Sequence, residues 1–275
     1  KLPMGNLLNV YSKCDQLMED HVKILHYSVL EEIIERESEK FIYPTGFIYH
    51  ETRCGSTLVA NMLSSIPQNI IWSESTAPWK VLHTCKDCQF RQIVKYMRLM
   101  MTLIGRKPNP AISNLPNKSR LFFKLQSSEG IEIISKAFPD VPWMFLFREP
   151  VEVMISRLGA QRLGMEGKHD LVTKNLKKLE AKRDAKKQQT EVKHANTLAQ
   201  YCKLAIKASE MYPGKGLMVE YSHLPSVIWD VALPKHFNIK IDDEELEALN
   251  KATNVYSKAT ESDKTGFKED TKEKH

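Results

Sequence analysis

Five consecutive residues have the types that bind an anion: Arg53, Cys54, Gly55, Ser56 and Thr57. The apolar run 47–49 precedes them and indicates a buried strand, and apolar residues recur at helical spacing over 58–63. Backbone N–H groups at such a helix start point outward, and the helix dipole adds partial positive charge. Gly55 lets the backbone approach a ligand closely, and Arg53 adds a fixed planar cation. The segment therefore predicts a phosphate-binding strand, loop and helix.

A second cation, Arg148, ends the apolar run 143–147 and is followed by Glu149 and Pro150. Proline suits the first turn of a helix, so this segment also indicates a strand, a turn and a helix. Ligands of α/β sheets bind at the carboxyl ends of the strands, where Arg148 is expected. Ser156 follows Arg148 by eight residues, and it can share one anion with Arg148 only if the chain bends there.

Together the two motifs resemble those of sulfotransferases that use 3′-phosphoadenosine-5′-phosphosulfate (PAPS). The family pattern basic–x–Gly–[Ser/Thr]–Thr, which binds the 5′-phosphosulfate, is matched by residues 53–57. The family's Arg-[Asp/Glu]-Pro, with a Ser eight residues after the Arg, binds the 3′-phosphate, and Arg148 and Ser156 take those places. The resemblance covers roughly residues 45–270. It implies an α/β fold, a three-layer sandwich with a central parallel sheet.

The resemblance also implies catalytic roles. Lys124 ends the predicted third strand, where these enzymes carry a Lys, and Glu74 follows the second strand. A Glu at this place is similar to the tyrosylprotein and other Golgi-type enzymes, in which it is the base. The cytosolic branch has a His base shortly after the Lys, where this chain has Gln126 and Ser127. We therefore expect Glu74 to take the acceptor proton.

In this reading, Arg53 and Lys124 neutralise the bridging and sulfuryl oxygens while the acceptor attacks the sulfur in line. The product is 3′-phosphoadenosine-5′-phosphate (PAP), and no metal is expected. Near the end of the chain, three residues resemble the basic loop that closes over the 3′-phosphate: Lys264, Gly266 and Lys268. The segment 219–224 resembles the family's late strand with Tyr-Glu-x-Leu, although Ser222 replaces its Glu.

Two rival functions stay open. An inactive PAPS-binding protein would keep Arg53 and Arg148 without turnover. A nucleotide-type kinase with a degenerate phosphate loop would need a Lys after Gly55 and a carboxylate for Mg²⁺, and neither is evident. His50 and His83 are competing candidates for the base, and His50 has a packing or hydrogen-bonding role as its alternative.

The pair Cys85 and Cys88, with His83 nearby, allows three interpretations: a zinc site, a redox pair, or ordinary loop and helix residues. Five cysteines in 275 residues do not form a disulfide framework, which favours a reducing compartment and a cytoplasmic protein. Residues 1–20 lack the apolar core of a signal peptide, and no apolar run reaches membrane-spanning length.

The pattern of apolar residues predicts short strands alternating with helices, which indicates a parallel sheet covered on both faces. The predicted strands are 47–49, 69–72, 121–123, 143–147 and 217–219. The predicted helices are 16–40, 56–65, one or two over 79–104, 131–138 and 151–158. We expect a single sulfotransferase-like domain over 1–275, with a helical N-terminal segment 1–40 and a lysine-rich helical insertion at about 165–212.

The net charge of +6 suits an anionic ligand and does not by itself indicate nucleic acid. Residues 168–193 hold nine Lys or Arg and four Asp or Glu, which fits either a solvated helical face or a cationic lid. The expected partner is a small-molecule acceptor, with no nucleic acid and no membrane, and a homodimer is left open. The acceptor itself is not determined by the sequence, because its pocket is expected to come from the variable segments, 76–118 and 159–200.

Overall fold

The computed structural model describes residues 26–85, 87–107, 119–154, 156 and 176–253, the side chains of Thr84 and of 176–190 excepted. Its centre is a sheet of five parallel strands in the order β2-β3-β1-β4-β5. The strands are β1 (Pro44–His50), β2 (Asn69–Ser73), β3 (Arg120–Lys124), β4 (Trp143–Phe147) and β5 (Gly216–Glu220). The predicted α/β class with a central parallel sheet is confirmed.

Both faces of the sheet are buried, as the apolar strands require. Along β1, Phe47 and Tyr49 pack on one face while Ile48 packs on the other. Along β4, Trp143 and Phe145 join the first cluster, and Met144 and Leu146 join the second. This alternation follows from the period-two direction of side chains in a strand. Helices must therefore cover both faces.

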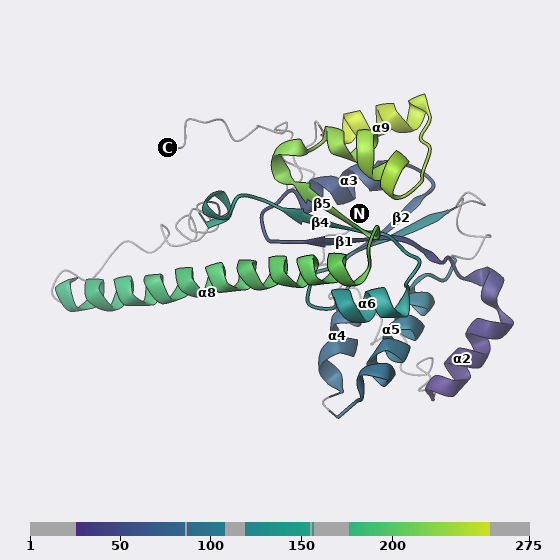
Figure 1. Ribbon diagram of the computed structural model, residues 1–275, viewed down its shortest axis with the longest axis horizontal. Helices are drawn as coiled ribbons and strands as arrows, with labels where there is room; N and C mark the ends of the chain where they lie inside the picture. The colour runs from purple at the N-terminus through teal and green to yellow at the C-terminus, as the bar shows by residue number, and fades with distance from the viewer. Residues whose placement is uncertain (1–25, 86, 108–118, 155, 157–175, 254–275) are drawn as a thin grey trace, which may run out of the picture.

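Figure 1 shows the two helical layers. One layer holds α4 (Thr76–Thr84), α5 (Phe90–Ile104), α6 (Ile131–Ala137) and α8 (Leu176–Met211), with α2 (Tyr27–Arg36) beside α5. The other holds α3 (Ser56–Ser65), a π-helical segment Ile228–His236 and α9 (Asp243–Thr253). Short 3-10 turns lie at Ser38–Lys40 and Tyr221–His223. The C-terminal half of α8 packs into the core through Ala205 and Ala208.

Most predicted elements are found, and one predicted helix needed correction. The helix expected over 16–40 is a shorter helix, Tyr27–Arg36, because the chain leaves helical geometry at Glu37 before a separate 3-10 turn; residues 1–25 lie outside the description. The stretch 79–104 forms two helices with a break at 85–89. Met97 and Met101 are fully buried core residues.

The break between α4 and α5 contains a disulfide between Cys85 and Cys88. The interpretation of these cysteines as ordinary loop or helix residues is therefore wrong, and neither sulfur is a free thiolate for zinc. Of the three interpretations, the bridge between cysteines three residues apart fits the redox pair.

No helix in the described part of the chain is long and apolar enough to cross a membrane. Among the same residues, no group of three metal-binding side chains comes together.

Candidate anion-binding and proton-transfer site

The strand order creates a switch point at the carboxyl ends of β1 and β4. From β1 the chain passes through α3 to β2 on one side, whereas from β4 it returns through α8 to β5 on the other. Parallel α/β sheets bind ligands in the crevice that such a reversal opens. Both predicted anion-binding motifs follow these two strands, so the fold brings them to one edge.

The segment 51–55 joins β1 to α3 in a tight turn. Arg53 and Gly55 both have positive φ angles, 63° and 79°. The first helical N–H with an internal partner is that of Val59, which donates to the carbonyl of Gly55 over 3.1 Å. The amides of Ser56, Thr57 and Leu58 precede it at the start of α3, where they are oriented to meet an anion.

Two features of the structure favour glycine at position 55. Its left-handed conformation is strained for other residues. A Cβ there would also lie 2.7 Å from the Leu224 side chain and 3.0 Å from the ring of Tyr221. The segment after β5 thus packs directly on the turn 51–55, a contact that the sequence pattern did not reveal.

Hydrogen bonds of Glu51 and Cys54 hold the turn 51–55 in place. Cys54 is fully buried and donates its thiol to the carbonyl of Glu51 over 3.0 Å. Burial raises the pKa of the Cys54 thiol to about 12, so this residue contributes its backbone and not a thiolate to the site. The carboxylate of Glu51 accepts from the thiol of Cys202 in α8 over 2.8 Å and from the amide of Arg148 over 3.3 Å.

Arg53 and Ser156 meet across the site, although they come from different motifs. The Arg53 Nε donates to the hydroxyl of Ser156 over 3.0 Å, and its Nη2 donates to the Ser156 carbonyl over 3.3 Å. The residue expected at the 5′-phosphosulfate thus contacts a residue expected at the 3′-phosphate. After Arg148 a helix begins at Pro150, where Glu149 caps the amide of Glu152 over 2.9 Å.

Arg148 lies at the carboxyl end of β4, as predicted. Its Nε donates to Glu152 over 2.6 Å, and its guanidinium lies 4.2 Å from the centroid of the Tyr221 ring. The spacing of four residues on a helix could have suggested Glu152 as a partner. The contact with Tyr221 could not have been predicted from the sequence, because Arg148 follows β4 and Tyr221 follows β5, and only the fold brings these two strand ends together.

Glu74, Lys124 and His50 form a compact cluster at the ends of β2, β3 and β1. Lys124 is buried and forms an ion pair with the Oε1 of Glu74, and the Nε2 of His50 lies 3.5 Å from the same oxygen. Glu74 has a positive φ of 52°, held by a hydrogen bond from its amide to the Lys124 carbonyl over 2.7 Å. Gln126 occupies the region of the missing histidine and donates to the Glu74 carbonyl over 3.3 Å.

The pKa values of the two glutamates at this edge, Glu51 and Glu74, are shifted in opposite directions. His50 and Lys124 lower the pKa of Glu74 to about 2 against the cost of burial, so its carboxylate is ionised. Burial raises the pKa of Glu51, and the hydrogen bonds from Cys202 and Arg148 offset this only in part.

The remaining predicted residues divide into three groups. Ser56 is buried at the start of α3 and Thr57 is partly exposed beside it. Lys264, Gly266 and Lys268 lie outside the described residues. His83 is at the end of α4, where it lies 3.5 Å from Glu129, in a pair separate from the Glu74 cluster.

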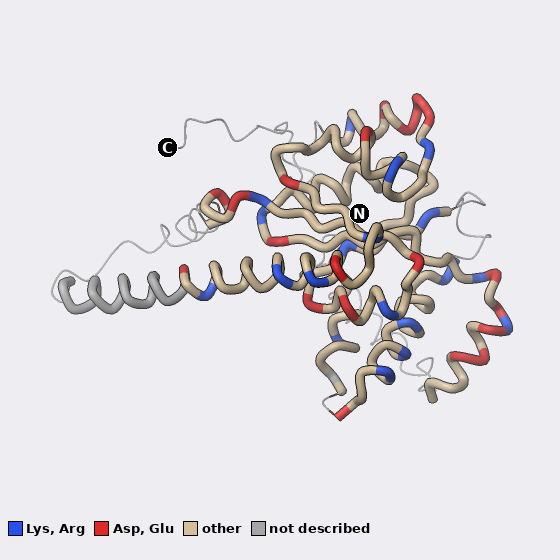
Figure 2. Tube along the Cα trace, in the orientation of Figure 1, with Lys and Arg blue, Asp and Glu red and all other residues tan. Residues whose placement is uncertain are grey.

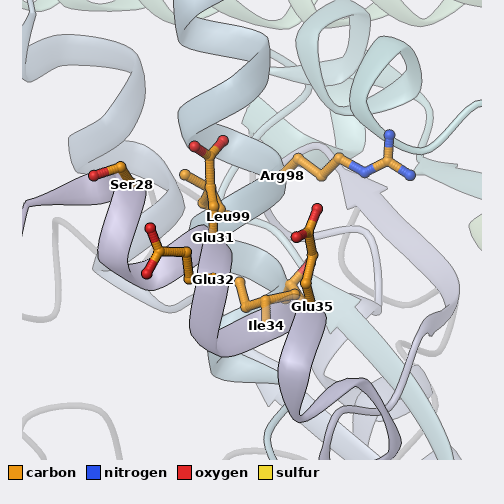
Figure 3. Close-up of a pocket in the computed structure, with 8 residues that line it drawn as sticks. Ser28, Glu31, Glu32, Ile34, Glu35, Arg98 and Leu99 are labelled. Atoms are coloured by element: carbon orange, nitrogen blue, oxygen red, sulfur yellow. The ribbon is translucent and has the colours of Figure 1, made fainter.

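A cavity of about 470 Å³ lies elsewhere, between α2 and α5. Figure 3 shows its lining, with Glu31, Glu32 and Glu35 from α2 and Arg98 from α5. Figure 2 shows the carboxylates spread along α2 at the margin of the molecule. Three carboxylates would repel an anion, so this cavity does not compete for the predicted ligand.

No family model and no curated protein sequence matches this chain. Solved structures do match it. A sulfotransferase from Mycobacterium avium is similar over 81% of this chain and 71% of its own, at 13% identity and a TM-score of 0.46. A sulfotransferase from Alicyclobacillus acidocaldarius is similar over 76% and 91%, at 11% identity and a TM-score of 0.46. Retinol dehydratase in complex with retinol and PAP is similar over 82% and 69%, at 13% identity and a TM-score of 0.38. The case for a function rests on the residues of the site.

Proposed function

We propose that this chain is a sulfotransferase that moves the sulfuryl group of PAPS onto a hydroxyl or amine of a small-molecule acceptor. The observation that carries the proposal is the convergence of two anion-binding motifs and a Lys–Glu pair at one edge of a parallel sheet. Arg53 contacts Ser156 over 3.0 Å, and Lys124 pairs with Glu74 on the neighbouring strands.

The residues at this edge fit an anionic donor with two phosphate positions. The amides of 56–58, the hydroxyls of Ser56 and Thr57, and Arg53 would hold the 5′-phosphosulfate. Arg148 and Ser156 would hold the 3′-phosphate, and the contact of Arg148 with Glu152 would have to yield to it. Lys264, Gly266 and Lys268 are proposed to close over the same phosphate, on the resemblance of their segment.

When bound, PAPS supplies the sulfuryl group, which an acceptor attacks in line with the bridging oxygen of the leaving 5′-phosphate. Arg53 and Lys124 stabilise negative charge that develops on the oxygens around sulfur. Glu74 accepts the hydrogen bond of the acceptor and takes its proton. The ion pair with Lys124 keeps the Glu74 carboxylate charged and oriented before an acceptor arrives.

Binding of the two phosphates can be tested without knowing the acceptor. PAP should raise the melting temperature by mass action, and adenosine diphosphate, which lacks the 3′-phosphate, should do so much less. Equal stabilisation by both nucleotides would remove the assignment of Arg148 and Ser156.

Turnover is tested with sulfur-35-labelled PAPS and a panel of phenols, primary alcohols, amines and tyrosine peptides. Transfer of label to any acceptor in the presence of a metal chelator supports the proposal and excludes a kinase. Binding of PAP with no transfer to any acceptor class would favour the inactive PAPS-binding protein.

A further inference from the structure

His50, the last residue of β1, has a buried ring nitrogen that faces the proposed base. The residue is only 7% exposed. Its Nε2 has no hydrogen-bond partner among the described residues, and it lies 3.5 Å from Oε1 of Glu74. A polar atom left unpaired in a buried position is costly unless it has a task or a transient partner.

The other ring nitrogen fixes the tautomer of His50. Its Nδ1 lies 2.5 Å from the carbonyl oxygen of Glu51. A carbonyl can only accept, so Nδ1 must carry the hydrogen. In the neutral ring the Nε2 therefore holds a lone pair, and this lone pair is directed toward a carboxylate. Two acceptors face each other across 3.5 Å, which is an arrangement that a proton would stabilise.

The contacts of Glu74 are divided unequally between its two oxygens. Both the Lys124 ammonium and the His50 ring lie against Oε1. No contact to Oε2 is recorded within the described part of the chain, and the side chain is 32% exposed. Oε2 is thus the oxygen that can meet an acceptor, while Oε1 is the oxygen held by the protein.

We propose that His50 is the proton store of this site, a positioning residue that receives through Glu74 the proton that the acceptor gives up. The inference rests on the proposed sulfuryl transfer and adds a residue to it. A carboxylate beside a lysine binds a proton weakly, because the ammonium favours the charged form. A neutral imidazole in contact with that carboxylate gives the proton a more stable place.

The proton balance is complete within the cluster. The acceptor oxygen or nitrogen bonds to sulfur as the bond from sulfur to the bridging oxygen breaks, and that electron pair leaves with the 5′-phosphate. The acceptor proton moves to Oε2 of Glu74, and a turn of the carboxyl group about its Cγ–Cδ bond brings it to Nε2 of His50. The imidazolium and the carboxylate then form an ion pair, and His50 gives the proton to water before the next turnover.

The surroundings of His50 contain charges of both signs. Glu74 and Lys124 face it from β2 and β3, and the carboxylate of Glu51 follows it in the chain. The carboxylate of Glu51 is already bonded to the Cys202 thiol of α8 and to the Arg148 amide after β4, so Glu74 is the anion left to pair with a charged His50.

The kinetic test compares His50→Asn with a control, His236→Asn. Asparagine keeps a donor near the Nδ1 position but has no counterpart of Nε2. His236 is also partly buried and contacts a backbone carbonyl, that of Trp143 over 2.8 Å, but at the amino end of β4, the end away from the site. The rate of PAP formation from PAPS, with 4-nitrophenol and tyramine as acceptor probes, should fall at least about 10-fold in His50→Asn and stay normal in His236→Asn.

The pH profile separates proton storage from packing. The rate of the unmodified protein should fall on the acid side of the profile, because a protonated His50 cannot accept another proton. His50→Asn should lose this acid limb. An unchanged acid limb or an unchanged rate in His50→Asn would overturn the proposal. The control is the rise in melting temperature that PAP induces: a rise equal to that of the unmodified protein would show that the cofactor site of the variant is intact.

A second readout needs no turnover. Nitrogen-15 NMR of histidine-labelled protein should show His50 as the tautomer with hydrogen on Nδ1, and its Nε2 chemical shift should change in Glu74→Gln but not in Glu129→Gln. The opposite tautomer, or an Nε2 signal indifferent to Glu74, would refute the pair. If no acceptor class of the panel is sulfated while the NMR coupling is present, the proposed function fails and the His50–Glu74 pair stands.

Discussion

Glu51 and Glu74 lie at the same edge of one sheet, yet their surroundings drive them toward opposite protonation behaviour. Glu51 is fully enclosed and bonded to a thiol and a backbone amide, and burial raises its pKa. Glu74 is partly exposed and contacts Lys124 and His50, which lower its pKa to about 2. Carboxylates whose environments push their pKa values apart usually have different tasks.

The difference separates the edge into two regions. The region at β1 and β4, with Glu51, Arg53 and Arg148, holds together the segments that would bind phosphates. The region at β2 and β3, with Glu74 and Lys124, carries the group that would move a proton. His50 belongs to both, since its Nδ1 contacts the carbonyl of Glu51 and its Nε2 faces Glu74.

The largest effect is expected from Glu74→Gln. The amide keeps the shape of the side chain but cannot take a proton as a carboxylate does. Turnover should fall by at least about 100-fold. The affinity for PAP, measured by calorimetry, should stay nearly unchanged because Glu74 lies outside the phosphate-binding region.

The matched control for this variant is Glu129→Gln, which removes the same charge beside His83. It should turn over normally. Near-normal turnover in Glu74→Gln with the true acceptor would refute the assignment of the base, and a larger loss in His50→Asn than in Glu74→Gln would move the role to His50.

Arg148→Ala should have the converse effect. A charge-assisted phosphate contact contributes about 1.5–3 kcal/mol, so the affinity for PAP should fall about 10- to 100-fold. Arg120→Ala is the control, because Arg120 is paired with Glu245 over 3.0 Å at the other end of β3. Unchanged PAP binding with lost turnover in Arg148→Ala would place Arg148 in the chemical step and merge the two regions.

The sequence was sufficient for the strands and for the residues at their ends. α3 and β4 have the predicted bounds, Ser56–Ser65 and Trp143–Phe147, because a run of apolar residues between polar loops leaves little choice of register. Since carboxyl ends of parallel strands meet at one edge, the fold class alone brought Arg53, Lys124 and Arg148 to the same side of the sheet.

The partners of those residues could not be predicted. The contact between Glu51 and Cys202 spans 151 positions, and the contact between Arg53 and Ser156 spans 103. Neither leaves a periodic signal, because each depends on how α8 and the turn after β4 pack. The segments 228–236 and α9 were also missed, since Pro234 and a run of acidic residues obscure their helical spacing.

Cys202→Ala should lower the free energy of unfolding through the proposed phosphate-binding region, and it should leave the contacts of Glu74 unchanged. It leaves one carboxylate oxygen of the buried Glu51 without its thiol donor, which typically costs about 1–2 kcal/mol. Urea denaturation should show this loss in the free energy of unfolding, and Cys202→Ser, which keeps a donor, should recover most of it. Equal losses in both variants would mean that packing of the sulfur, and not its hydrogen bond, is what matters.

The smallest and most discriminating effect is the dependence of stability on pH. Burial raises the folded pKa of Glu51 above the ordinary value of 4.5, so the native state holds this proton more tightly than the unfolded chain. Stability relative to Glu51→Gln should therefore be greatest below pH 4.5 and fall as the pH rises above it, by at most about 1.4 kcal/mol per pH unit. Glutamine loses one of the two acceptor oxygens, which adds a constant cost and leaves the slope unaffected.

Glu74 should give a slope of the opposite sign. Its folded pKa of about 2 lies below 4.5, so its contribution to stability is complete above pH 4.5 and is lost as the pH falls toward 2. Urea midpoints of the unmodified protein, Glu51→Gln and Glu74→Gln between pH 3 and 8 measure both differences. The difference from Glu74→Gln should grow from pH 3 to about 4.5 and then level off, whereas the difference from Glu51→Gln should decline at higher pH. Slopes of the same sign would mean that the two carboxylates share one environment, and the separation of this edge into two regions would fail.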